Sequence, residues 1–142
     1  MDSSRSAAAV LDQSTHEPQR SIAPRISYVL ARLERVTRER LGACVAPYGL
    51  SVSQYTALSI LGSRSGLSNA QLARRTYVSP QAMNQILEQL DRAELIVREP
   101  HATHGRIRAT RLTEAGKVVL AECDAAVDAM EADMLQDLNA DA

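Results

Sequence analysis

Residues 67–93 read LSNAQLARRTYVSPQAMNQILEQLDRA and contain two helix starts of the same design, eleven residues apart. At the first, Ser68 is a suitable N-cap and Gln71, three residues on, completes a capping box. At the second, Ser79 is the cap and Pro80 takes the first helical position. The three residues TYV between the helices leave room only for a tight turn. A short helix, a tight turn and a longer helix form a helix-turn-helix.

The second of these helices separates its apolar and polar side chains. Four apolar residues recur at the spacing of one buried stripe, namely Met83, Ile86, Leu87 and Leu90. Away from that stripe, the first turns carry Gln81, Asn84 and Gln85. Side-chain amides can pair bidentately with an adenine edge in the major groove of DNA. A simple solvated face is the alternative interpretation, but the capped helix before it and the hairpin after it favour DNA reading.

The stretch after this helix, residues 95–113, reads LIVREPHATHGRIRATRLT and predicts a β-hairpin. Residues 95–97 and 107–112 are the expected strands, and Gly105 ends the loop that joins them. Three arginines cluster at and beyond the loop: Arg106, Arg108 and Arg111. A basic hairpin beside a helix-turn-helix is a wing, and an arginine at its tip can enter a narrow minor groove.

Composition limits the class of protein. The 142 residues suffice for one domain, and a hydrophobic content of 45% without Trp or Phe predicts an aliphatic core. We find no apolar run long enough to cross a membrane and no secretory signal. Cys44 and Cys123 are too few for a disulfide framework, so the cytoplasm is the expected compartment. The sequence also lacks the motifs of common enzymes, which predicts a non-enzymatic protein without a cofactor.

The net charge of −1 hides an uneven distribution of charge along the chain. Residues 64–111 carry eight Arg against four acidic residues, whereas residues 113–142 carry one Lys against eight acidic residues. The basic block therefore coincides with the predicted helix-turn-helix and wing, as phosphate binding requires. The acidic C-terminal block is expected to face away from DNA.

In chain order, the pattern predicts four parts. Residues 1–21 are small and polar without periodicity and are expected to be a disordered tail. Residues 22–49 form an N-terminal dimerisation helix, residues 50–112 the winged helix-turn-helix, and residues 113–142 a C-terminal dimerisation helix. The fold class is therefore mainly α with a small β-wing.

The two outer helices each carry an apolar stripe. In the first helix the stripe is Ile26, Val29, Leu30, Leu33, Val36, Leu41 and Val45. In the last helix, capped by Thr113, it is Val119, Cys123, Val127, Met130, Met134 and Leu138. Within one chain, only the first helix is expected to cover the last. A further helix starts at Ser51, where Gln54 completes another capping box.

These segments resemble the MarR family of winged helix-turn-helix regulators over residues 24–138. The resemblance is carried by LSVSQYTALSIL, by LSNAQLARRTYVSPQAMNQILEQLDRAELIVR and by GRIRATRLTEAG, in that order and spacing. It implies a homodimer that binds a pseudo-palindromic operator, and the predicted function is that of a ligand-responsive repressor. It also implies that a small-molecule effector releases the DNA.

The resemblance assigns the helix Ser68–Thr76 to the first motif helix and Ser79–Arg92 to the recognition helix. Arg106 matches the arginine that similar proteins place in the minor groove. The expected DNA-binding residues are Ser68, Asn69, Arg74, Arg75, Ser79, Pro80, Gln81, Asn84, Gln85, Arg106 and Arg108. Where the family wing reads Asp-Pro-x-Asp-Arg-Arg, residues 101–106 read HATHGR, so both acids and one arginine are missing. The family also continues into a further dimerisation helix, so the C-terminal part is expected to be incomplete.

Other side chains allow competing interpretations. Tyr48 and Tyr55 flank the junction between outer helices and head, where an effector pocket is one interpretation and core packing the stronger one. Cys44 and Cys123 fit buried apolar positions better than oxidation sensors. His101 and His104 lack a third ligand, so no metal site is predicted. A winged helix that binds a protein partner is the alternative function, because fold alone does not fix function.

Overall fold

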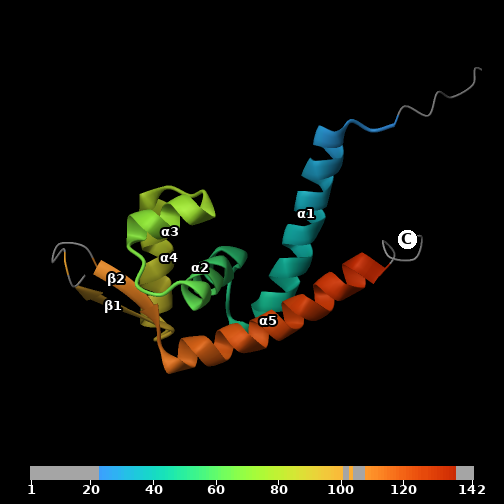
Figure 1. Ribbon diagram of the computed structural model, residues 1–142. Helices are drawn as coiled ribbons and strands as arrows, with labels where there is room; N and C mark the ends of the chain where they lie inside the picture. The colour runs from blue at the N-terminus through green and yellow to red at the C-terminus, as the bar shows by residue number, and fades with distance from the viewer. Residues whose placement is uncertain (1–22, 101–102, 104–107, 137–142) are drawn as a thin grey trace, which may run out of the picture.

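The computed structural model describes residues 23–100, 103 and 108–136. Its elements in chain order are α1 (Ile26–Val45), the short 3-10 helix η1 (Ala46–Tyr48), α2 (Val52–Ser63), α3 (Asn69–Thr76), α4 (Pro80–Arg92), β1 (Ile96–Pro100), β2 (Arg108–Leu112) and α5 (Glu114–Leu135). Figure 1 shows α2, α3, α4 and the two strands gathered into one body, which we call the head. Helix α1 projects away from the head, and α5 runs along the bottom of both.

The helices begin where the capping residues predict. The backbone N–H of Gln54 donates to Ser51 Oγ at 3.2 Å, and Gln54 Oε1 accepts from the Ser51 N–H at 2.7 Å. Ser68 and Gln71 form the same reciprocal pair at the start of α3. Each box satisfies two backbone donors that a helix N-terminus would otherwise leave unpaired. The local sequence therefore fixes the chain entry into both helices.

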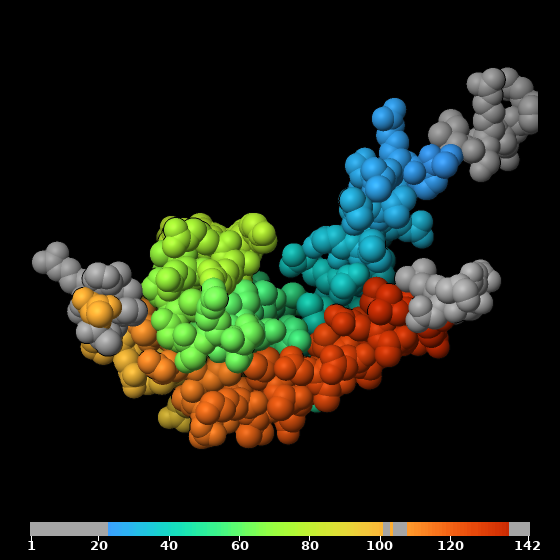
Figure 2. All heavy atoms as spheres, in the orientation of Figure 1, coloured from blue at the N-terminus to red at the C-terminus, as the bar shows by residue number. Residues whose placement is uncertain are grey.

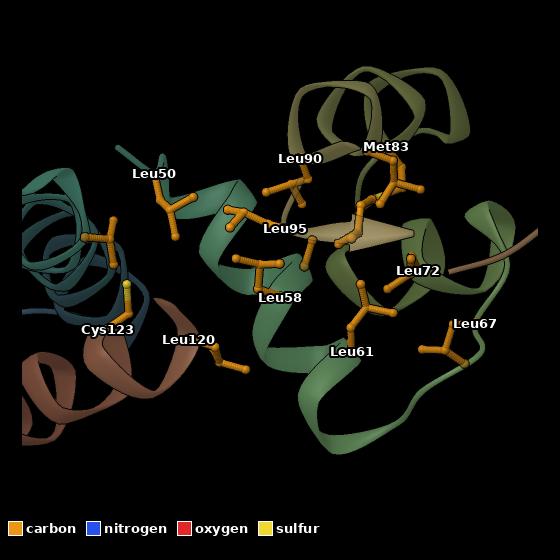
Figure 3. Close-up of a cluster of buried hydrophobic side chains, with 14 of the residues drawn as sticks. Leu50, Leu58, Leu61, Leu67, Leu72, Met83, Leu90, Leu95, Leu120 and Cys123 are labelled. Carbon is orange, nitrogen blue, oxygen red and sulfur yellow. The ribbon is translucent and has the colours of Figure 1, made fainter. Parts of the chain in front are cut away.

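A single aliphatic core holds the head together. The buried stripe of α4 packs against leucines of α2 and α3, as the close-up in Figure 3 shows. The largest fully buried side chains of the head are Leu58, Leu61, Leu72, Met83, Leu87 and Leu90. Burial of each such side chain contributes roughly 1.5–3 kcal/mol. This core continues into the end of α1 and into α5, and it fixes α4 on its inner face while leaving its outer face open.

The predicted hairpin is present, with a shifted first strand. β1 runs to Pro100 rather than ending at Val97, and it pairs antiparallel with β2 from Ile96↔Leu112 to Pro100↔Arg108. The segment before α3 adds a bridge between Leu67 and Thr110, which ties the hairpin to the helices of the head. The loop residues His101, His104, Gly105 and Arg106 lie outside the described residues.

Helix α5 is covered more extensively than the sequence predicts. Its buried residues include Leu120, which lies outside the predicted stripe, as well as Cys123 and Val127. α5 packs against α1, but also against α2 and β2, so the expectation that only the first helix covers it is wrong. The reason is tertiary, because the turn after β2 directs α5 back beneath the head. Leu138 and the rest of the acidic C-terminus lie outside the described residues.

Helix α1 leaves most of its apolar stripe uncovered. Only its last turns are covered, with Val45 fully buried and Leu41 partly buried. Towards the N-terminus the stripe is open to solvent: Ile26 is 77% exposed, Leu30 58% and Leu33 51%. In Figure 2 this half of α1 stands clear of the head. No helix among residues 23–100 and 108–136 is long and apolar enough to cross a membrane.

Candidate nucleic-acid interface

The turn between α3 and α4 sets the geometry of the motif. Tyr77 adopts the left-handed conformation at φ 56° and closes α3, with its N–H donating to the Ala73 carbonyl. Val78 also donates to Ala73, at 3.1 Å, and Ser79 then caps α4 by accepting from the Ala82 N–H at 3.1 Å. The predicted tight turn is therefore confirmed. This turn fixes the angle between α3 and α4.

Asn69, expected at the DNA, also has a structural contact inside the motif. Its Nδ2 donates to the backbone carbonyl of Pro80 at 3.0 Å and so joins the N-terminal turns of α3 and α4. Its Oδ1 is buried and has no partner among the described residues. The side chain is therefore held between the two helix starts. A role in fixing their relative position is shown by this contact, whereas a DNA contact stays a prediction.

The outer surface of the motif presents the other predicted residues. Those with exposed side chains are Arg74, Arg75, Ser79, Pro80, Gln81 and Gln85, while Ser68 and Asn84 are half-buried. Among the described residues, neither Arg74 nor Arg75 is paired with a carboxylate. Unpaired guanidinium groups on an exposed helix retain all their donors for phosphate oxygens. This surface therefore combines free positive charge with amide groups.

Asn84 differs from its two neighbouring amides because it is already engaged. Its Nδ2 donates to Glu88 Oε1 at 2.7 Å, and its Oδ1 accepts from Arg98 Nη2 at 3.3 Å. Arg98 lies on β1, so this contact joins the recognition helix to the wing. Neither partner was predicted from the sequence. The spacing of Asn84 and Glu88, four residues apart on a helix, was a visible signal, whereas the contact with Arg98 depends on how the hairpin packs.

The wing contributes further positive charge. Arg108 is exposed, and its Nη2 donates to the Arg98 carbonyl at 3.1 Å across the hairpin. Arg111 lies 3.7 Å from Glu99, measured from Nε to Oε2, in an exposed pair of the kind that contributes little to stability. Such pairs exchange partners readily. Arg106, the residue predicted at the wing tip, lies outside the described residues.

Tyr48 and Tyr55, the candidate effector residues, both pack against the core. The Tyr55 hydroxyl donates to Asp124 Oδ1 of α5 at 2.8 Å. Burial, together with this hydrogen bond and the nearby charge of Asp124, raises the pKa of Tyr55 above its ordinary value. These contacts agree with the interpretation as core packing. They also make Tyr55 a link between the head and α5.

A cavity of about 440 Å³ lies beside this link, between the end of α2, β2 and the start of α5. Arg111 and Lys117 bring positive charge to its wall, and Asp124 brings the carboxylate that holds Tyr55. Leu61 and Leu120 contribute apolar surface. The volume falls within the range of small-molecule sites, and the wall offers both apolar surface and cations for an organic anion.

Cys123 lies on α5, and Cys44 lies on α1 where that helix packs against α5. Cys123 is fully buried, and burial raises the pKa of its thiol, which disfavours the reactive thiolate. Cys44 is half-buried, with its Sγ 3.8 Å from the carbonyl oxygen of Ala126. Both positions agree with packing roles.

Comparison with known proteins identifies the family. A family model described as MarR family matches residues 48–107. The HTH-type transcriptional repressor Rv2887 of Mycobacterium tuberculosis is 35% identical over 115 residues, which cover 81% of this chain and 83% of the relative. The chain belongs to the MarR family. The family accounts for the order of elements seen here, with the winged motif between two outer helices.

Two solved structures of this relative resemble the MarR-family chain closely. Mycobacterium tuberculosis Rv2887 in complex with DNA superposes with a TM-score of 0.71 at 34% identity, covering 83% of this chain and 87% of the other. Rv2887 in complex with salicylic acid gives a TM-score of 0.69 at 35% identity, covering 84% and 88%. The relative therefore binds both DNA and a small aromatic acid on this fold.

Proposed function

We propose that this MarR-family chain is a cytoplasmic transcriptional repressor that binds a pseudo-palindromic operator as a homodimer. The observation that carries the proposal is the outer face of the motif, where Gln81 and Gln85 stand exposed beside the unpaired Arg74 and Arg75. A surface with amides for base edges and cations for phosphates fits duplex DNA. The DNA complex of a relative at 34% identity supports this use of the fold.

Each predicted residue has a distinct part in this proposal. Gln81, Asn84 and Gln85 read base edges, each good pair contributing roughly 1–3 kcal/mol of discrimination. The residues that fix register on the phosphates and sugars are Ser68, Asn69, Ser79 and Pro80, at the two helix N-termini, together with Arg74 and Arg75 in the last turn of α3. Arg106 and Arg108 hold the flanking minor groove and backbone from the wing.

The uncovered stripe of α1 supplies the dimer interface in this proposal. A contiguous row of exposed Ile26, Leu30 and Leu33 is unusual for a monomer in water. A second copy related by a two-fold axis covers it with the same residues from its own α1. The two recognition helices then enter successive major grooves about 34 Å apart.

We further propose a small aromatic acid as the effector. Salicylic acid is bound by the relative Rv2887. In this chain, the cavity lined by Arg111, Lys117 and Asp124 has the size for such an anion. Its two cations are paired with Glu99 and Glu114 on the surface, and the carboxylate of the effector would replace those partners. Because Asp124 also accepts the Tyr55 hydroxyl, an anion there perturbs the link between head and α5.

Gel shifts and fluorescence anisotropy with the chain's own promoter region test the DNA proposal. Arg74→Ala should weaken binding to all duplexes and lower the salt slope by about 0.9 per lost phosphate contact. Gln81→Ala should instead reduce preference for the operator over unrelated DNA. Arg35→Ala, an exposed arginine on α1, is the matched control and should change neither. Salt-insensitive heparin elution and no gel shift would favour a protein-binding winged helix.

A further inference from the structure

The recognition helix holds one of its three amides in a fixed orientation. Gln81 and Gln85 are exposed, and neither has a hydrogen bond among the described residues. Asn84, by contrast, is held from both ends, by Glu88 at 2.7 Å and by Arg98 at 3.3 Å. The contrast within a single helix face indicates that Asn84 has a more defined geometry than its neighbours.

The chemistry of the two partners determines which way the amide points. A guanidinium group can only donate hydrogen bonds, and an ionised carboxylate can only accept them. Arg98 therefore requires the amide oxygen and Glu88 requires the amide nitrogen. If the amide were reversed, its nitrogen would face a donor and its oxygen would face an acceptor. The network thus leaves Asn84 one orientation.

In this orientation the Asn84 amide still has hydrogen-bonding positions available for a base. The oxygen can accept two hydrogen bonds and the nitrogen can donate two, and the network uses one of each. One acceptor and one donor position remain, and bidentate contact with an adenine edge uses one of each. Reversing the amide would exchange the two positions and match a different pattern on the base pair. The partners of Asn84 therefore affect which base it selects.

Arg98 lies half-buried on β1, and its backbone carbonyl accepts from Arg108. Among the described residues its Nε is buried without a partner, so the contact with Asn84 is the side-chain hydrogen bond that orients it. A buried donor without a partner costs roughly 1–3 kcal/mol. Glu88 is also restrained on its other side, with Oε2 3.9 Å from Arg92. A continuous chain of hydrogen bonds therefore joins the wing to α4, from Arg98 through Asn84 to Glu88.

We infer that Arg98 and Glu88 are positioning residues that set the base preference of Asn84 without touching the base themselves. The inference rests on the proposed function, since it assumes that α4 reads DNA. In this inference the wing has a second role besides its proposed contact with the minor groove. The wing strand β1 supplies the donor that orients a reading side chain.

The test is a base-by-base binding profile of the full chain. Each base pair of the operator duplex is replaced in turn, and affinity is measured by fluorescence anisotropy. Asn84→Ala should lose preference at one base pair per half-site, by about 5- to 150-fold in relative affinity. Glu88→Gln and Arg98→Gln should reduce preference at that same base pair and at no other. Arg98→Lys, which keeps a charged donor, should restore part of it.

The double variant Asn84→Ala with Arg98→Gln separates an indirect role from a direct one. If Arg98 acts through Asn84, the double variant should have the profile of Asn84→Ala alone. Arg35→Gln removes the same charge from an exposed site on α1, away from the Asn84 network, and controls for general electrostatics. Glu88→Gln changes a partly exposed side chain and leaves the buried core intact, so the test does not depend on Arg98 variants folding.

Two results would overturn the inference while leaving the proposed function intact. One is an Arg98→Gln profile that loses preference at a different base pair or adds to the loss in the double variant, since Arg98 would then contact DNA directly. The other is unchanged base preference in both Glu88→Gln and Arg98→Gln. An unsubstituted chain without any base preference would overturn the proposed function, and this inference with it.

Discussion

The head and the projecting half of α1 both carry regular stripes of aliphatic side chains, but only the stripes of the head are buried within the chain. In the head, Leu58, Leu72 and Leu87 are fully buried within one chain. In α1, Ile26, Leu30 and Leu33 follow an equally regular helical spacing and remain in solvent. A periodic apolar stripe therefore predicts that a helix face is buried, but it does not predict whether the same chain or a second molecule covers that face. The stripes of α2, α3 and α4 are buried within one chain, whereas in the proposed function a second copy covers the stripe of α1.

The largest expected effect falls on α1. Leu30→Glu places a charge in the proposed interface, where burying it unpaired is costly. We expect the dimer to dissociate and operator affinity to fall by about 10²- to 10⁴-fold, because the second half-site contact is lost. Sedimentation velocity and anisotropy measure the two effects. Val118→Glu is the matched control, since Val118 on α5 has the same 58% exposure as Leu30; equal behaviour of the two variants would contradict the α1 interface.

The corresponding change in the head should affect folding rather than assembly. Leu87→Ala leaves a cavity at a fully buried position of α4 and should lower the free energy of unfolding by about 2–5 kcal/mol. Urea unfolding at fixed protein concentration measures it, because dimerisation makes stability depend on concentration. Val118→Ala, at an exposed site, should stay within about 0.5 kcal/mol. A similarly small loss in Leu87→Ala would mean that the head core is not closed as described.

The smallest effect concerns the link between the head and α5. Tyr55→Phe removes the hydrogen bond to Asp124 and should cost about 0.5–1.5 kcal/mol near neutral pH. Because the pKa of Tyr55 is raised in the folded chain above its ordinary value of 10.0, the unfolded chain loses this proton first. The stabilising contribution of Tyr55 is therefore complete below pH 10.0 and declines as pH rises above it.

Urea midpoints of both chains between about pH 8 and 11 provide the measurement for Tyr55. The difference between wild type and Tyr55→Phe should be constant up to the ordinary pKa of tyrosine and then narrow. Tyr28→Phe changes an exposed tyrosine of α1 and serves as the control. A difference that widened with pH would contradict the sign of the pKa shift.

Much of the candidate site was predictable because its signals are local. Ser68, Gln71, Ser79 and Pro80 define two helix starts through contacts of three residues or fewer, and the structure confirms those starts. The wing followed from strand propensity and turn residues, although β1 extends to Pro100. Strand ends are harder to predict because they depend on the partner strand rather than on the residues themselves.

Other features were not predictable from local patterns. The network of Asn84 depends on Arg98, fourteen residues away along the chain and on another element. The packing of α5 beneath α2, with Leu120 beside Gly62, arises from the direction of the chain after β2. The link from Tyr55 to Asp124 joins residues sixty-nine apart. Each of these contacts depends on where distant elements pack.

The sequence by itself determined the helix-turn-helix, the wing, the amide-bearing face of α4 and the apolar stripes, because caps, turns and periodicity act over a few residues. The tertiary structure decided which stripes one chain covers and which partners restrain each polar side chain. In the tertiary structure the Gln81 side chain is exposed, whereas Asn84 is hydrogen-bonded to Glu88 and Arg98. The Asn69 side chain is hydrogen-bonded between the N-terminal turns of α3 and α4. Hydrogen bonds between elements depend on packing in three dimensions, which sequence spacing does not encode.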